Sequence, residues 1–356
     1  MSIKQIRDGV GMTAIIVALA CVAATGCSSK PRATRVKADP ALATLRSTTF
    51  DRLALDQLRE QAVGVLVAMA DHDDPQVRAN AIEGLTKVPA RAAEVIAKAT
   101  KDESAAVRAV AAMGAGRERL RETMPSIRTL LNDPSEYVRA AAIFAMVRCD
   151  ETVDRSPLGG MLVSDDSLKL RAHAAYILGE IGDRSAQGML RDAMGKVPAR
   201  ASEAEVRLFQ MQVAEALIKL GDDSELAGIR AALFPAAPED LEMTALSMQI
   251  LGQVKDTSSV SGIITLIERR TDNAYDMPPE IRLLGASTLA KLGNVEGDFI
   301  GDQYRSDDRP MVRMQVASVY GETRHRENLG VLAEMLRDPD ERVLVAAATG
   351  ILNIVR

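Results

Sequence analysis

The sequence predicts an all-α protein built as an α-solenoid, and three observations lead to that fold class. Aromatic residues make up only 3% of the 356 residues and Trp is absent, whereas β-sandwiches are rich in aromatic and β-branched side chains. Hydrophobic residues reach 47% and charged residues 26%, so the chain can bury a core. A short motif also recurs along most of the chain, and such repetition predicts stacked units in place of the separate domains that length alone favours.

The N-terminus is predicted to be a bacterial lipoprotein signal. Lys4 and Arg7 precede an uncharged stretch over residues 9–29, and a basic start, a short apolar run and small residues are typical of secretion signals. Cys27 directly follows Ala-Thr-Gly, which resembles a lipobox. The resemblance implies cleavage of a signal peptide over residues 1–26 and lipid attachment to Cys27. One alternative is an uncleaved transmembrane anchor, because 21 residues just span a bilayer. The other is ordinary secretion.

Residues 27–46 are predicted to be a flexible basic tether. The segment contains Lys30, Arg32, Arg35 and Lys37 and lacks apolar periodicity. These cations either contact anionic lipid head groups or are merely solvated. Signal and tether together imply the bacterial cell envelope. A Ser directly after the Cys, here Ser28, resembles the pattern of lipoproteins sent to the outer membrane. We therefore expect the protein to be anchored in the outer membrane and to face the periplasm.

The remaining residues, 47–356, are predicted to be one array of about nine helical hairpins. Each hairpin has a first helix that carries the motif and a second helix that follows it. Six copies carry an Arg in the same position, with spacings of 30, 31 and 32 residues in the first run and 31 in the last. Two degenerate copies have Gln210 and Thr244 there, and a final copy has Leu344. The repeat arginines are Arg78, Arg108, Arg139, Arg171, Arg282 and Arg313.

Local physical chemistry supports helices in each copy. Asp74-Pro75 suits a helix start, because Asp caps the first turn and Pro fits its first position. Val77, Ala81 and Leu85 then recur at helical spacing. The pattern resembles HEAT-like repeats, of the short kind found also in phycobilisome-lyase proteins. That resemblance covers only the repeat and implies no lyase activity. Left-handed C-caps are expected at Gly182, Gly221 and Gly293.

The repeated Arg admits two interpretations. Six guanidinium groups in one register could form a ladder that captures phosphate or carboxylate groups. In proteins that this pattern resembles, such an Arg instead braces neighbouring units by bonding to the acid or backbone of a nearby turn. We favour bracing, because every copy has an Asp close by in the sequence.

The sequence offers no constellation of catalytic or metal-binding residues. His72, His173 and His325 fall in distant repeats. The acidic run at Asp71–Asp74 lacks the Gly and distal Glu of a calcium-binding loop, and Cys149 is expected to be buried. With a net charge of −5, nucleic-acid binding is not indicated. We therefore expect no enzyme activity, no cofactor and no metal.

The predicted function is a lipid-anchored interaction scaffold that binds a protein or peptide on its concave face. Second helices are expected to line that face, where Arg128, Arg191 and Arg230 occupy equivalent positions. Tyr275 lies in an insertion and is expected either to contact the partner or to pack against its own repeat. A glycan- or peptidoglycan-binding module and an accessory subunit of an envelope enzyme are the alternatives.

Overall fold

The computed structural model describes residues 39–164, 167–271 and 274–355. The predicted signal peptide and Cys27 lie outside these residues, as does most of the predicted tether. Within them the chain is an all-α solenoid of helical hairpins, as predicted, with one two-stranded antiparallel sheet. No helix in the described ranges combines the length and the apolar character that crossing a membrane requires.

The described first helices, nine in number, carry the repeat position. They are α4 (Pro75–Leu85), α6 (Ala105–Arg117), α8 (Glu136–Arg148), α10 (Leu168–Ile181), α12 (Glu203–Lys219), α14 (Leu241–Gln253), α16 (Pro279–Lys291), α18 (Pro310–Thr323) and α20 (Glu341–Ile354). The second helices are α5 (Pro89–Ala99), α7 (Met124–Thr129), α9 (Ser156–Val163), α11 (Gln187–Gly195), α13 (Leu226–Ala231), α15 (Val260–Glu268), α17 (Asp298–Tyr304) and α19 (Asn328–Met335).

Two further helices precede the first repeat, and short elements fill the turns. The preceding helices are α2 (Pro40–Arg46) and α3 (Arg52–Met69). The 3-10 turns are η2 (Arg121–Thr123), η3 (Leu130–Asn132), η4 (Arg184–Ala186), η5 (Asp223–Glu225), η6 (Pro238–Asp240) and η7 (Thr257–Ser259). The strands are β1 (Arg270–Thr271) and β2 (Ala274–Tyr275), paired with Arg270 opposite Tyr275. They pair within the insertion that contains Tyr275.

The helices belong to two compact units. Unit 1 contains Pro89–Ala232, and unit 2 joins residues 39–88 to residues 233–355. Unit 2 therefore contains both ends of the described chain. Each unit has its own layer of first helices packed side by side.

In unit 1 the first helices approach one another closely because small residues line their contacts. A Cβ on Gly116 of α6 would lie 2.8 Å from the Cα of Ala145 on α8. A Cβ on Gly179 of α10 would likewise lie 2.8 Å from the Cα of Ala216 on α12. Real Cβ atoms do not fit at such distances, so these glycines allow backbone-to-backbone packing that no other residue permits.

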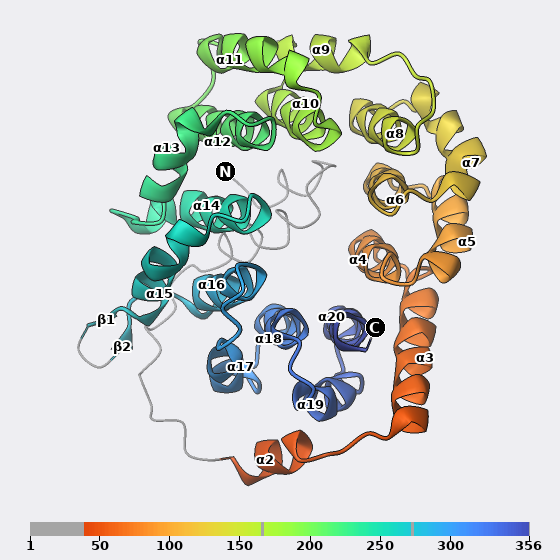
Figure 1. Ribbon diagram of the computed structural model, residues 1–356, viewed down its shortest axis with the longest axis vertical. Helices are drawn as coiled ribbons and strands as arrows, with labels where there is room; N and C mark the ends of the chain where they lie inside the picture. Colours follow the sequence, from red (N-terminus) through yellow and green to blue (C-terminus); the bar gives the residue numbers. More distant parts are fainter. Residues whose placement is uncertain (1–38, 165–166, 272–273, 356) are drawn as a thin grey trace. The chain divides into compact units, whose positions relative to one another are not determined.

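This close packing overturns the expectation that second helices line the concave face. Within unit 1 the first helices α6, α8, α10 and α12 lie on the inner side of an arc, and the second helices lie on its outer side (Figure 1). The first helices stand close together because Ala and Gly face one another. The second helices of unit 1 bury fewer of their residues than the first helices do. A two-layer array bends toward its more tightly spaced layer, so the first helices occupy the inside.

In unit 2 the N-terminal helices pack on the C-terminal repeat. Both α3 and α4 contact α20, and α2 contacts α19 (Figure 1). A Cβ on Gly84 of α4 would overlap the side chain of Thr349 on α20. A Cβ on Gly321 of α18 would lie 2.5 Å from the Cα of Gly350 on α20. Small residues thus join the first repeat to the last one by the same means that joins neighbouring repeats.

Helix ends follow the predicted signals with one systematic difference. Gly182, Gly221 and Gly293 have φ values of +80°, +90° and +93°, as predicted for left-handed caps. Asp74 caps α4 directly. Asp133 and Asp338, however, each lie two residues before the N-cap, which is Ser135 or Asp340. Each Asp carboxylate accepts a hydrogen bond from the backbone N–H of that N-cap residue. At these two repeats the Asp organises the turn and leaves its carboxylate free to accept the repeat Arg of the preceding unit.

The boundary of the predicted tether is wrong at its C-terminal end. Residues 40–46 form α2, and Leu42 on it is buried. The Asp39-Pro40 start has the same helix-starting chemistry as the repeats, and Arg46 lies in the last turn, where a cation suits the helix dipole. Only residues 27–38 of the tether prediction lie outside the described structure.

Candidate functional site

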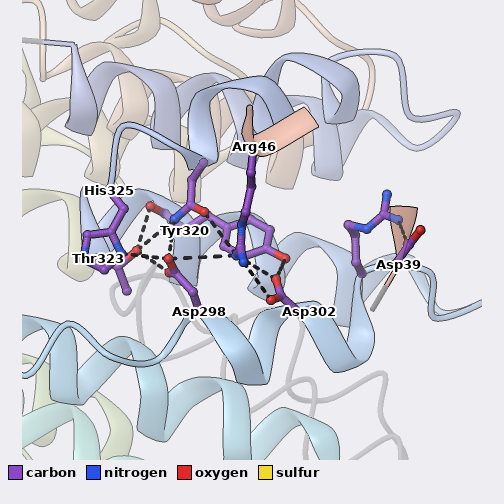
Figure 2. Close-up of polar contacts among 9 residues, drawn as sticks. Asp39, Arg46, Asp298, Asp302, Tyr320, Thr323 and His325 are labelled. Atoms are coloured by element: carbon purple, nitrogen blue, oxygen red, sulfur yellow. Dashed lines mark hydrogen bonds and ion pairs between the residues drawn. The ribbon is translucent and has the colours of Figure 1, made fainter. Parts of the chain in front are cut away.

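A cluster of polar side chains in unit 2 lies where α2 docks onto the C-terminal repeats. Figure 2 shows Arg46, at the end of α2, pointing into a cluster formed by α17, the end of α18 and the start of α19. Seven residues from the C-terminal repeats form the two ends of this surface, which we call the α2 site: Asp298, Asp302, Arg305, Tyr320, Thr323, His325 and Asn328.

Arg46 is held by a two-pronged contact with Asp302. Its Nη1 donates to Asp302 Oδ2 at 3.0 Å and its Nη2 to Asp302 Oδ1 at 2.8 Å. Nη2 also donates to Asn328 Oδ1 at 3.4 Å, and the guanidinium carbon lies 5.8 Å from the centroid of the Tyr320 ring. Paired hydrogen bonds of this geometry recognise the planar fork of Arg and would not be reproduced by Lys.

The acidic side of the site is organised by the repeats themselves. Tyr320 donates its hydroxyl to Asp302 at 2.7 Å. Asp298 accepts from Thr323 Oγ1 at 2.7 Å and from Asn328 Nδ2 at 3.0 Å, and His325 Nδ1 lies 2.7 Å from it. These partners come from α18, α19 and the turn between them, so both carboxylates are positioned without help from α2.

Burial gives the site a net demand for a cation. Burial raises the pKa of the Asp302 carboxyl, and the hydrogen bonds from Tyr320 and Arg46 oppose this only in part. The pKa of Tyr320 is also raised well above its usual value, by burial and by the adjacent Asp302. A half-buried carboxylate with a neighbouring acid, Asp298, is costly to leave unpaired, and Arg46 supplies the positive charge.

The opposite end of α2 is held by a second ion pair. Arg305, which caps the end of α17, donates from Nη2 to Asp39 Oδ2 at 2.6 Å. This hydrogen bond, together with the bond from the N–H of Ala41, lowers the pKa of the Asp39 carboxyl. Arg305 also lies 3.4 Å from Glu334 of α19. Opposite charges thus hold both ends of a seven-residue helix.

Gly330 allows the backbone of α2 to approach α19. A Cβ at Gly330 would overlap the carbonyl oxygen of Leu45 and would lie 3.3 Å from the Cβ of Thr48. Gly330 is buried and helical. Its lack of a side chain therefore serves the contact with α2, because no turn or positive φ requires glycine there.

The sequence does not reveal this site, because Arg46 and Asp302 are 256 positions apart in the chain. Arg46 falls in the segment predicted to be a tether, and Asp298 and Asp302 have no distinctive spacing. One signal was present: Asp39-Pro40 followed by Leu42 and Leu45 repeats the helix-start pattern seen at Asp74-Pro75.

The predicted strip of Arg128, Arg191 and Arg230 lies on the second helices α7, α11 and α13. Two of these cations are engaged with acids of the following turn. Arg128 donates to Glu151 at 2.6 Å, and Arg191 donates from Nη2 to Asp222 at 2.7 Å. Because the second helices of unit 1 lie on the outer side, this strip does not line a concave surface, and its ion pairs leave little uncompensated charge.

Tyr275 is not an exposed contact residue. It lies in β2 with 5% of its surface exposed. The guanidinium carbon of Arg282 lies 3.3 Å from its ring centroid, and Arg270 donates to its hydroxyl at 2.6 Å. The insertion folds back so that Tyr275 packs on the repeat Arg, which is the second of the two roles considered for it.

The repeat arginines brace the array. Four of them share one geometry, in which Nη1 donates to the carbonyl oxygens six and five residues earlier. Arg108 and Arg313 also form paired hydrogen bonds with the Asp of the next repeat, Asp133 and Asp338, at 2.7–2.9 Å. The guanidinium groups of Arg108 and Arg313 thus join their own turn to the next one. The four are Arg78, Arg108, Arg139 and Arg313.

The two remaining repeat arginines are buried more deeply. Arg171 donates to the carbonyl oxygens of Leu162, Ala193 and Lys196. Arg282 is fully buried and donates to Ile267, Glu268, Gln303 and Tyr304. Every one of these contacts is internal to the protein, so the arginines form no open ladder for anions.

Other candidate groups also take part in packing. Cys149 is buried, and burial raises the pKa of its thiol. His173 is buried with Nε2 3.2 Å from the carbonyl oxygen of Tyr137. His72 accepts the N–H of Asp74 within its turn. Among the described residues, no group of three or more His, Cys, Asp and Glu side chains is arranged to hold a metal ion.

Comparisons with known proteins agree with the repeat architecture. A family model described as HEAT repeats matches residues 92–167. None of the curated proteins matches the chain. A solved structure of the CpcE–CpcF complex of phycocyanin lyase from Nostoc sp. PCC7120 is 15% identical, with a TM-score of 0.40, and the match covers 81% of this chain and 98% of that chain.

Two further solved structures are similar over most of the chain. Human deoxyhypusine hydroxylase in complex with glycerol is 16% identical, with a TM-score of 0.35, and covers 85% of this chain and 99% of its own. An engineered protein is 16% identical, with a TM-score of 0.32, and covers 88% and 98%. At these TM-scores the likenesses support no statement about ligand or activity. With the family match in unit 1 and the repeated bracing Arg in both units, the chain is an all-α solenoid of HEAT-like repeats.

Proposed function

We propose that the protein is a lipid-anchored interaction scaffold of the bacterial envelope, that it binds a protein or peptide partner, and that it is not an enzyme. One observation carries the proposal: the repeats hold a short helix from outside the repeat array, α2, by side-chain contacts at both of its ends. Solenoids commonly present surfaces of this kind to partner chains. The anchoring part rests on the lipobox resemblance around Cys27.

Anchoring is tested by the mass of the protein isolated from a Gram-negative host. We expect the wild-type chain to lack residues 1–26 and to carry acyl groups on Cys27. Cys27→Ala should retain the signal and carry no acyl group. Cys21→Ala, a change to the other cysteine of the signal region, is the matched control and should behave as wild type. An unmodified or uncleaved wild-type chain contradicts the anchor.

Partner binding is tested by crosslinking in native membranes followed by purification and mass spectrometry. Ala174 is fully buried in α10, so Ala174→Pro should break the stacking of unit 1 at a cost of about 3 kcal/mol or more. Glu203→Pro is the control, because residue 203 is the exposed first position of α12, where Pro is tolerated.

Enrichment of one defined protein by wild type and Glu203→Pro, but not by Ala174→Pro, supports the proposal. Sedimentation of the purified protein with peptidoglycan, without any protein partner, would replace it with the glycan-binding alternative. Turnover of a substrate by the isolated protein would contradict the non-catalytic part.

A further inference from the structure

The helix α2 contributes little buried apolar surface to the fold. It has seven residues, and Leu42 is its one buried side chain. An isolated helix of this length is not stable in water, so α2 exists as a helix because the α2 site holds it. Its attachment depends on the Arg46 and Asp39 ion pairs and on the approach over Gly330, and ordering its residues opposes that attachment.

The α2 site, in contrast, is preformed. Asp302 accepts the Tyr320 hydroxyl, and Asp298 accepts from Thr323 and Asn328. All of these bonds are made within the C-terminal repeats and involve no atom of α2. The site would then present two carboxylates, one of them half-buried, with no cation between them. Charge and geometry would favour another Arg.

The fit of Arg46 is also incomplete. Its Nε is buried, yet it has no hydrogen-bond acceptor among the described residues. A buried donor without an acceptor weakens a contact.

We propose that α2 is an exchangeable internal ligand and that the α2 site binds a helical segment of a partner protein in its place. The segment has the chemistry of α2: an acidic N-cap followed by Pro, which pairs with Arg305, and an Arg six residues after that Pro, which pairs with Asp302. The backbone carbonyl of the residue before that Arg approaches Gly330. This inference rests on the proposed function of binding a protein or peptide and specifies where and what the scaffold binds.

Competition with α2 sets the affinity that an external segment shows. The connection over residues 47–51 keeps α2 near its site at an effective concentration in the millimolar range. An external helix must therefore compete with α2, and its apparent affinity falls by the fraction of molecules in which the site is vacant. Weakening α2 should raise the affinity for the same external helix.

The test uses the full chain in detergent and a fluorescent peptide with the sequence of residues 37–50. Anisotropy titration should give a dissociation constant at least ten-fold lower for the Arg46→Ala chain than for wild type. Arg52→Ala is the matched control, because Arg52 is exposed and starts α3 just beyond the segment. This variant should bind the peptide as weakly as wild type does.

Two further variants define the site. In the Arg46→Ala background, Asp302→Asn or Gly330→Val should weaken peptide binding at least ten-fold, the former by removing the acceptor of the Arg and the latter by filling the space for the backbone. A peptide in which the Arg is replaced by Ala should bind at least ten-fold more weakly than the original. Circular dichroism identifies whether Asp302→Asn or Gly330→Val fails to fold. If one of them does, peptide binding by the other variant tests the site.

The proposal is overturned if the peptide does not bind the Arg46→Ala chain, or if the Ala-substituted peptide binds equally well. It is also overturned if hydrogen exchange shows residues 40–46 equally protected in wild type and Arg46→Ala, since α2 would then be a permanent part of the fold. None of these results depends on lipid attachment or on a natural partner. A scaffold that captures its partner elsewhere therefore remains distinguishable from a failed scaffold.

Discussion

The repeat arginines should stabilise the array far more than the arginines on the outer surface. The sharpest test is Arg108→Met in unit 1, which keeps an apolar side chain of similar length and removes the guanidinium. Arg108 joins the turn at Asp102 and Glu103 to Asp133 of the next repeat. The matched change is Arg128→Met, which removes an Arg that also pairs with an acid but lies on the second helix α7.

The structure gives the expected magnitudes. The side chains of Arg108 and Asp133 are only 13% and 5% exposed, and breaking a buried pair costs about 3–5 kcal/mol because the remaining charge is left unpaired. Asp133 keeps its hydrogen bond from the N–H of Ser135 in this variant, so we expect Arg108→Met to lower the free energy of unfolding by about 2–4 kcal/mol. The Arg128–Glu151 pair is 53% and 39% exposed, and Arg128→Met should cost about 0–1 kcal/mol.

Urea unfolding followed by far-ultraviolet circular dichroism measures both costs. Because repeat arrays can unfold in parts, hydrogen exchange of α6 and α8 should accompany it and should show the loss of protection beginning at these helices. Equal costs for the two variants would refute the reasoning. So would a cost below about 0.5 kcal/mol for Arg108→Met, the range of surface substitutions.

Three further predictions follow from packing and charge. Gly179→Ala should destabilise unit 1 by about 1–3 kcal/mol, because the added Cβ would meet the backbone of α12 at 2.8 Å. Gly160→Ala is the control and should stabilise α9 by up to about 1 kcal/mol, because nothing lies within 4 Å of its added Cβ. Thermal melting measures both variants, and equal shifts in melting temperature would contradict the close approach at Gly179. The Arg313 guanidinium holds the pKa of the Asp338 carboxyl below its usual value of 3.8, so the stabilisation from this pair is complete above about pH 4 and is lost as the pH falls through the lower pKa of the folded state. The difference in unfolding free energy between wild type and Arg313→Met should therefore shrink on acidification. A difference that stays constant down to pH 2.5 would contradict this prediction. Cys149 is buried and the pKa of its thiol is raised, so it should react slowly with a thiol reagent. In a chain with the two N-terminal cysteines replaced by Ser, we expect labelling at least a hundred-fold slower in the folded protein than in urea. Rapid labelling of the folded chain would show instead that the thiol is accessible.

The repeat architecture was predictable because its signals are local and recur. The Arg register at Arg78, Arg108 and Arg139 predicts the first helices, and the glycine caps lie where the end of each apolar pattern indicates. A helix start or end depends on residues within one or two turns of it. Repetition then adds independent evidence for the same unit, so single weak copies such as those with Gln210 and Thr244 are still assigned correctly.

The direction of curvature depended on information that no single repeat contains. A composition rich in Ala predicts close helices but does not say which layer packs more tightly. In unit 1 that difference arises where Gly116 faces Ala145 and Gly179 faces Ala216 across neighbouring first helices. Because facing residues are set by packing between repeats, the side on which Arg128 and Arg191 lie followed only from the tertiary structure.

By itself the sequence determined an all-α array of HEAT-like repeats and favoured a bracing role for its arginines, because both depend on short-range patterns repeated many times. Only the tertiary structure decided that residues 40–46 are a docked helix, that Tyr275 is buried against Arg282, and that Arg46 meets Asp302. The last contact joins single positions 256 residues apart, with neither periodicity nor repetition to reveal it. A unique long-range pair is chosen by shape and charge in three dimensions, and those exist only after the chain has folded.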